Sequence, residues 1–341
     1  CSSQELGPER FKIALTPDLM GQSGIFVLNP DRTGGRRITA EATAQLRPTS
    51  WSPDGKKIAF FAARSEDTPM RTKYRIPLHF PLYWMNSGGG SPKRLLDFPV
   101  SDFEFSPDGR QLLFVSAYDD PAHNDPQVVQ GLKNPMSAVY LMDLQEKTQR
   151  RVTGFGQHCS GSWSPDGTRV ALSFGDLQSS DIYVATVDGR HTRRLTESPG
   201  IKRKPVWAPG GKQIAYVSFI PQAGGMVSHA YTVDPGGSQP RQVGDAHAYE
   251  VAWSPDGRAL LLRLTDGFVL VSAEGKTLVD MENRVVRAQD AAFTPDGKGV
   301  MFRSNHEGPW FLYAMDLNGA NTRRISGNLS ASTFCLSPLR R

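Results

Sequence analysis

Side chains that could bind a metal ion or transfer protons are spread over several loop-like segments of the chain. Imidazole and carboxylate groups are common metal ligands, and the candidates are Asp119, Asp120, His123, Asp125, His158 and His247. They lack the short, regular spacing of a local metal motif. We therefore predict no metal site. The alternative, a metal ion at the mouth of a channel, would have to use these residues.

Motifs for other enzyme chemistry are absent from the sequence. There is no Gly-x-Ser-x-Gly nucleophile elbow, and Gly88-Gly89-Gly90 lacks the Lys-Ser/Thr of a phosphate-binding loop. Cys159 and Cys335 lie outside any haem or zinc-finger spacing. The sequence therefore predicts neither a catalytic residue nor a bound cofactor.

Two segments have the composition of a protein-contact surface. The segment 116–137 offers apolar anchors of the kind that interfaces use, namely Val128, Val129, Leu132, Pro135 and Met136. A basic patch, Lys202-Arg203-Lys204, is expected in a connection between strands. We expect these residues to contact a partner.

A pentapeptide of the type Trp-Ser-Pro-Asp-Gly recurs along the chain. Its copies are Trp51–Gly55, Phe105–Gly109, Trp163–Gly167, Trp207–Gly211, Trp253–Gly257 and Phe293–Gly297, with a truncated copy at Leu336-Ser337-Pro338. Pro presets the backbone of a tight turn, and Gly adopts the positive φ that closes it. A repeat of roughly 40–50 residues is typical of solenoids and propellers.

Four short strands are expected in each repeat. Apolar residues alternate after each turn, as in Gln213-Ile214-Ala215-Tyr216, and a third strand follows, as in Val139-Tyr140-Leu141-Met142. The fourth strand often carries an Arg-Arg pair, for example Arg150-Arg151, which keeps an exposed sheet edge soluble.

The phase of the repeat predicts a closed ring. The chain enters at the second strand of a repeat and ends with a lone first strand, Thr333–Leu336. We predict an all-β fold, a single seven-bladed β-propeller of four-stranded antiparallel blades, closed by pairing of the N- and C-terminal strands in one blade. The propeller would span residues 11–341.

Strand order divides the connections between two faces. The Ser-Pro-Asp-Gly turns share one face, which we call the turn face. The insertions 62–81, 116–137 and 220–228 belong to the other, which we call the opposite face. Long loops on a rigid scaffold often carry function, so we expect the functional surface on the opposite face.

The repeats resemble the PD40 (WD40-like) repeats of the TolB-type β-propeller family, over essentially residues 11–338. The resemblance rests on the recurring Pro-Asp-Gly. It implies a propeller fold without deciding the function. Oligogalacturonate lyases have a similar fold and use axial histidines to bind a metal, and this resemblance is the basis of the metal-site alternative.

The first residue predicts attachment to a membrane. The chain begins Cys1-Ser2-Ser3, as bacterial lipoproteins do after processing, and a covalent lipid on Cys1 is expected. Residues 1–10 would form a flexible tether, and Ser2 favours the outer membrane. The expected location is the periplasmic side of the bacterial cell envelope.

Two functions from different classes follow from these features. The first is a non-catalytic envelope lipoprotein that docks other envelope or membrane proteins through the opposite face, as a scaffold or accessory subunit. The alternative is a metal-dependent polysaccharide lyase-like enzyme or a small-ligand binder at the channel mouth. The net charge is +5 and the pI about 9.1, but nucleic acid is not an expected partner for a protein outside the cytoplasm.

Overall fold

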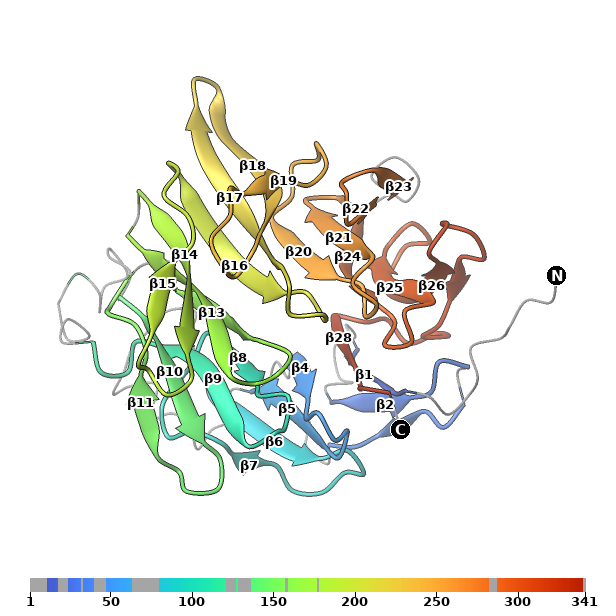
Figure 1. Cartoon of the computed structure of the whole chain (residues 1–341). Helices are drawn as coiled ribbons and strands as arrows, with labels where there is room; N and C mark the ends of the chain where they lie inside the picture. The colour runs from blue at the N-terminus through green and yellow to red at the C-terminus, as the bar shows by residue number, and fades with distance from the viewer. Residues whose placement is uncertain are drawn as a thin grey trace.

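The chain folds into β-sheets arranged around a central axis, as the computed structural model shows (Figure 1). The structure describes residues 11–17, 24–31, 33–39, 47–62, 80–120, 127, 136–156, 159–176, 178–281 and 287–339. Within these ranges, no helix is long and apolar enough to cross a membrane. The strands follow the predicted repeat, and the colour in Figure 1 runs around the ring from one sheet to the next.

Five four-stranded antiparallel sheets are separate blades within the described residues. The first contains β28 (Thr333–Leu336), β1 (Ile13–Thr16), β2 (Phe26–Leu28) and β3 (Arg36–Arg37). The second contains β4 (Arg47–Trp51), β5 (Lys57–Phe61), β6 (Leu82–Asn86) and β7 (Lys93–Arg94), and the third β8 (Asp102–Phe105), β9 (Gln111–Ser116), β10 (Ala138–Asp143) and β11 (Gln149–Arg151). The last two are β20 (Glu250–Trp253), β21 (Ala259–Leu264), β22 (Gly267–Ser272) and β23 (Thr277–Asp280), then β24 (Ala288–Phe293), β25 (Gly299–Ser304), β26 (Phe311–Asp316) and β27 (Arg323–Arg324).

The remaining strands form one eight-stranded sheet. It contains β12 (Ser160–Trp163), β13 (Arg169–Gly175), β14 (Ser180–Thr186), β15 (Thr192–Arg194), β16 (Ile201–Trp207), β17 (Ile214–Gln222), β18 (Gly225–Val233) and β19 (Arg241–Gln242). A parallel bridge between Ser180 and Ile201 joins β14 to β16.

The prediction of seven separate four-stranded blades is therefore wrong. The described part of the chain forms five such blades, and two further repeats merge into the eight-stranded sheet. The physical reason is the length of the two strands that meet: β14 and β16 have seven residues each, and no inner strand other than β16 has more than six in the described chain. Because β16 begins early, its first residue, Ile201, reaches the first residue of β14, Ser180, and pairs with it.

The predicted pairing of the two chain ends is confirmed. Strand β28 pairs antiparallel with β1, from Ile13 opposite Leu336 to Thr16 opposite Thr333. Pairing across the termini satisfies the main-chain groups of both strands, which would otherwise form exposed edges.

The pentapeptide turns form a ring of contacts between neighbouring repeats. In five of the turns the hydroxyl donates to the aspartate, as Ser52 Oγ does to Asp54 Oδ1 at 2.6 Å, and accepts a main-chain N–H, here from Lys57 at 2.9 Å. The glycine has a left-handed backbone (φ 71° at Gly109) and lies against the proline of the preceding repeat. The same glycine–proline contact recurs at Gly55–Pro338, Gly109–Pro53, Gly167–Pro107, Gly211–Pro165, Gly257–Pro209 and Gly297–Pro255.

Tryptophans at the ends of the inner strands connect neighbouring repeats a second time. Trp163 Nε1 donates to the Glu104 carbonyl at 3.2 Å, and Trp253 Nε1 donates to the Val206 carbonyl at 3.2 Å. Each carbonyl belongs to the inner strand one repeat earlier. A buried indole N–H needs such a partner, so the aromatic residue of the pentapeptide also has a structural role.

Outer-strand arginines complete the connections between repeats. Arg241 donates from its guanidinium to the carbonyls of Ala273 (2.5 Å) and Glu274 (3.1 Å), in the next repeat's turn between its third and fourth strands. The guanidiniums of Arg150 and Arg193 lie beside the equivalent turn glycines, Gly189 and Gly237. The recurring arginines therefore contact the next repeat as well as shielding an edge.

Candidate functional site

The predicted metal ligands do not come together where the structure describes them. Asp119 accepts a hydrogen bond from the Tyr140 hydroxyl and lies 4.0 Å from the Arg151 guanidinium. Asp120 is buried and accepts the Met136 N–H at 2.9 Å. Both carboxylates thus support the start of β10.

Histidines do not supply the missing ligands within the described ranges. The His247 and His229 rings lie tilted against each other, with ring centroids 5.2 Å apart. His123, Asp125 and His158 lie outside the described residues. No group of three or more His, Cys, Asp or Glu side chains that could hold a metal occurs among the residues that are described.

Most of the predicted apolar anchors cannot be placed. Val128, Val129, Leu132 and Pro135 lie outside the described residues, as do Cys1 and the tether. Met136 is described, and 37 % of its surface is exposed. The anchor role of the segment therefore remains a prediction, apart from the exposure of Met136.

The basic patch at 202–204 is corrected by the structure. These residues belong to the inner strand β16 and not to a loop. Lys202 is completely buried, and its Nζ lies 3.2 Å from Asp181 Oδ1. A side chain without solvent access cannot contact a partner, so Lys202 is structural. Arg203 is half-buried with its guanidinium over the Phe219 ring, and Lys204 is exposed.

The expected loop at 220–228 is also corrected. The segment is the end of the long β17–β18 hairpin, with Ile220 opposite Val227 and Gln222 opposite Gly225. Apolar residues with β propensity continue the ladder past the rest of the sheet. Figure 1 shows this hairpin extending beyond the neighbouring sheets.

Exposed apolar side chains favour the opposite face. Met136 precedes the third strand β10, Met226 lies at the tip of β17–β18, and Tyr249 directly precedes the inner strand β20. Their exposed fractions are 37 %, 53 % and 36 %. All three therefore lie on the face away from the pentapeptide turns. Leu278 on an outer strand and Leu339 on the turn face are the other large apolar residues found exposed in the described chain.

A network of charged side chains lies on the inner strands, and the sequence analysis missed it. Lys204 pairs with Glu250, whose second oxygen lies 2.5 Å from Arg263 Nη2. Arg303 donates to Asp290 at 2.6 and 2.7 Å. The Lys204–Glu250 pair joins neighbouring sheets, whereas Glu250–Arg263 and Asp290–Arg303 each connect an inner strand to the second strand of its own sheet. A charged residue shortly before the aromatic end of an inner strand was the signal that could have revealed them.

Two of these residues have an unusual backbone. Lys204 (φ 51°) and Asp290 (φ 50°) adopt left-handed conformations, and each lies in a bulge of its inner strand. Bulges redirect side chains and are common near functional sites. Here they place Lys204 beside Glu250 and Asp290 beside Arg303.

Glu104 on β8 has a strongly perturbed carboxyl. Burial raises its pKa to about 8, against the opposing effect of the Trp163 N–H that it accepts at 3.0 Å, while the charge of Asp102 raises it further. Near neutral pH the group therefore carries a proton much of the time. No hydroxyl or thiol nucleophile within hydrogen-bonding distance of Glu104 is recorded among the described residues.

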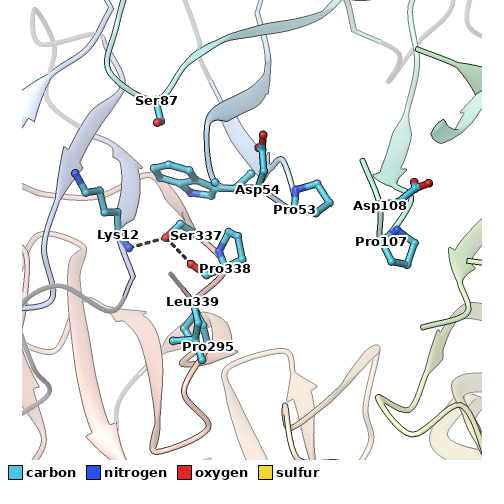
Figure 2. Close-up of a pocket in the computed structure, with 12 residues that line it drawn as sticks. Lys12, Pro53, Asp54, Ser87, Pro107, Asp108, Pro295, Ser337, Pro338 and Leu339 are labelled. Atoms are coloured by element: carbon cyan, nitrogen blue, oxygen red, sulfur yellow. Dashed lines mark hydrogen bonds between the residues drawn. The ribbon is translucent and has the colours of Figure 1, made fainter. Parts of the chain in front are cut away.

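The turn face contains a cavity of about 1080 Å³. Figure 2 shows Pro53, Pro107, Pro295 and Pro338 around it, with Leu339 at the position where other copies carry aspartate. Asp54 and Asp108 also line the cavity. Bonds from the neighbouring serine hydroxyls lower the pKa of both carboxyls. One oxygen of each aspartate is thus already used within its own turn.

Both described cysteines are free thiols. Burial raises the pKa of Cys159 and of Cys335 to about 12. A thiol with so high a pKa is protonated and unreactive near neutral pH.

Comparison with known proteins identifies the repeat. Residues 128–266 match the family model described as the TolB beta propeller domain, PD40. This segment of the chain is similar to a TolB-type β-propeller domain. The structure of TolB from Acinetobacter baumannii is similar to this chain at a TM-score of 0.55 and 18 % identity, covering 79 % of this chain and 62 % of that one. The family resemblance is thus confirmed.

Enzymes share the same PD40-type fold. An oligogalacturonate lyase in complex with manganese aligns at a TM-score of 0.63 and 16 % identity, over 86 % of this chain and 82 % of that one. "Uncharacterized peptidase YuxL" of Bacillus subtilis is 24 % identical over 60 % of this chain. The match covers only 29 % of that peptidase, so the chain spans well under half of its length. These likenesses establish the fold and leave the activity open.

A metal does not fit Glu250 or Asp290 on the inner strands. Glu250 is flanked by Lys204 and Arg263, and Asp290 by Arg303. The cations occupy the positions that a metal ion would need, and like charges nearby would oppose its binding. Among the described residues, the donor set therefore does not suit a manganese ion.

Proposed function

We propose that the chain is a non-catalytic protein-docking scaffold, or an accessory subunit of a membrane-associated complex, on the periplasmic side of a bacterial cell envelope. Partners would bind the opposite face. The observation that carries this proposal is the position of Met136, Met226 and Tyr249, which expose apolar surface on that face. Exposed aromatic and Met side chains are enriched in protein interfaces.

The contacts between repeats support a scaffold role. Glycine–proline, tryptophan–carbonyl and arginine–carbonyl contacts all cross from one repeat to the next. These three kinds of contact make the scaffold rigid, so its loops keep a fixed arrangement. A fixed arrangement lowers the entropic cost of binding a partner.

Replacement of exposed side chains tests the proposal. The double variant Met136→Ala/Tyr249→Ala should recover less of a partner crosslinked in native membranes, by about tenfold if the residues are interface anchors worth roughly 1.4 kcal/mol. Leu278→Ala removes a similarly exposed side chain from an outer strand and is the matched control. Equal recovery with all three chains would contradict docking through the opposite face.

A second candidate, small-ligand binding near the centre of the ring, is supported by the charge network of Lys204, Glu250 and Arg263. The fold similarity to a lyase suggests oligogalacturonate as the probe. A rise in the melting temperature with oligogalacturonate, lost in Lys204→Met, would favour this candidate over docking. An unchanged melting temperature, with and without manganese, would reject it.

A further inference from the structure

The β17–β18 hairpin is unusual in composition as well as length. Each strand has nine residues. From Gln213 to Val233 there is no Lys, Arg, Asp or Glu, in a chain of which 21 % is charged. Met226 near the tip is 53 % exposed. Exposed strand edges are normally protected by charge, by proline or by a covering segment.

The register fixes which main-chain groups point outward. Gln222 and Gly225 flank a two-residue turn and pair with each other, so they exchange main-chain hydrogen bonds. Alternation along an antiparallel ladder then directs the N–H and C=O groups of Met226, Ser228 and Ala230 away from β17. The Ala230 carbonyl accepts the Val243 N–H at 2.8 Å, as this alternation requires.

The two edges of the hairpin differ. On β17 the corresponding outward residue is Pro221, opposite Met226. Proline has no N–H, so it blocks pairing along that edge. The edge of β18 has no such block. Within the described chain, no hydrogen bond from another segment to the main chain of Met226 or Ser228 is recorded.

The open edge of β18 has a clear cause. Strand β19 pairs with β18 only at Tyr231 and Thr232. Gly244 then adopts a left-handed conformation (φ 70°) and packs against Val271 of the next sheet. The chain therefore leaves β18 before reaching Ser228, although a longer β19 would have covered the edge.

We propose that the edge of β18 at Gly225–Ser228 binds an extended, uncharged segment of a partner polypeptide by β-strand addition. The inference rests on the proposed docking function and specifies its mode. Main-chain hydrogen bonds to Met226 and Ser228 would hold the segment, and its uncharged character follows from the absence of charges along the hairpin, since a buried charge there would have no counterion.

A flexible segment fits this edge better than a second copy of the chain does. Two rigid copies paired along so short an edge would bury far less than the roughly 800 Å² per partner typical of a stable complex. An extended segment can continue across the opposite face, where Met136 and Tyr249 add exposed apolar surface.

Amide hydrogen exchange on the full chain tests the proposal. The probe is the uncharged peptide acetyl-Thr-Val-Thr-Val-Thr-Val-amide, and the same peptide N-methylated at every second residue is its control. The unmodified peptide should slow exchange of the Met226 and Ser228 amides by about tenfold when most of the protein is bound. The Val227 amide already bonds to β17 and should change much less.

A pair of variants separates main-chain from side-chain effects. Ser228→Pro removes the outward N–H, and Ser228→Ala keeps it. Peptide binding should survive Ser228→Ala and fall about tenfold in Ser228→Pro, the loss of one hydrogen bond worth roughly 1.4 kcal/mol. Unchanged melting temperatures would show that both variants fold.

Four results would overturn strand addition: equal binding by the two variants, equal protection by the N-methylated peptide, no protection of the two amides at millimolar peptide, or protection that rises with protein concentration alone. The last would identify a second copy as the occupant. Partner recovery that falls in Met136→Ala/Tyr249→Ala but not in Ser228→Pro would reject strand addition and leave the docking proposal intact.

Discussion

Lys202 Nζ lies 3.2 Å from Asp181 Oδ1, and both side chains are buried. The pair lies next to the parallel bridge from Ser180 to Ile201 that makes two repeats into one sheet. The Ser173 and Ser180 hydroxyls donate to the Lys202 carbonyl at 2.6 and 2.7 Å. Lys202 therefore connects its own repeat to the preceding one through its ammonium and its main-chain carbonyl.

Removing the Lys202 ammonium should destabilise the fold strongly. Lys202→Ala leaves Asp181 buried with Arg194 as its remaining cationic partner, and breaking a buried ion pair on one side costs about 3–5 kcal/mol. Urea unfolding measures the loss. The exposed Lys212 is the matched control, and Lys212→Ala should change the free energy of unfolding by no more than about 0.5 kcal/mol. Equal free energies of unfolding for Lys202→Ala and Lys212→Ala would show that Lys202 does not hold the two repeats together.

The stability of the pentapeptide turns should depend on the backbone conformation of their glycines more than on the space available for a larger side chain. Gly109→Ala places a side chain at φ 71°, where a Cβ would still lie 3.6 Å from Pro53. The conformation itself should cost about 1–2 kcal/mol. Gly210 occupies the aspartate position of another turn, without a left-handed backbone and with open space around it. Gly210→Ala should therefore be neutral or stabilising by up to about 1 kcal/mol in thermal unfolding. A similar loss in both variants would contradict this explanation.

Glu104 should make stability depend on pH in one direction. Burial raises its pKa from 4.5 to about 8 in the folded chain. Between these values the folded state holds a proton that the unfolded state has lost, so the free energy of unfolding should fall as pH rises from about 4.5 to about 8. Below about pH 4.5 the stabilising contribution of Glu104 to the free energy of unfolding is fully present.

Glu104→Gln is the corresponding test. The amide is neutral and can still accept the Trp163 N–H through its oxygen, so this variant should lose the decline across that pH window. Urea midpoints measured at several pH values give the slope. An unchanged slope would mean that Glu104 titrates as in the unfolded chain.

The repeat could be predicted from sequence because its signals are local. Turn chemistry at Ser52–Gly55 and its copies depends on residues a few positions apart, and the strand phase followed from it. The closure of β28 on β1 followed from the same phase. The merging of two repeats could not be predicted, because it depends on where the long strands β14 and β16 begin, at Ser180 and Ile201, and on the single bridge between these residues.

The candidate site was less predictable, for a related reason. Lys202 and Lys204 are two positions apart in sequence, yet one is buried against Asp181 and the other pairs with Glu250. A bulge between Arg203 and Val206 separates their environments, and single-sequence patterns do not reveal bulges. The segment 220–228 is expected to be a loop because it falls between the second and third strands of its repeat, whereas in the structure its residues continue the β17–β18 ladder.

Site-specific photo-crosslinking in native membranes tests docking through the opposite face most directly. A benzoylphenylalanine would replace Tyr249 on the opposite face, or Leu339 on the turn face, each exposed by 36–40 %. Docking through the opposite face predicts a discrete crosslinked partner from position 249 and none from position 339. Crosslinks from position 339 alone, or from neither position, would contradict it.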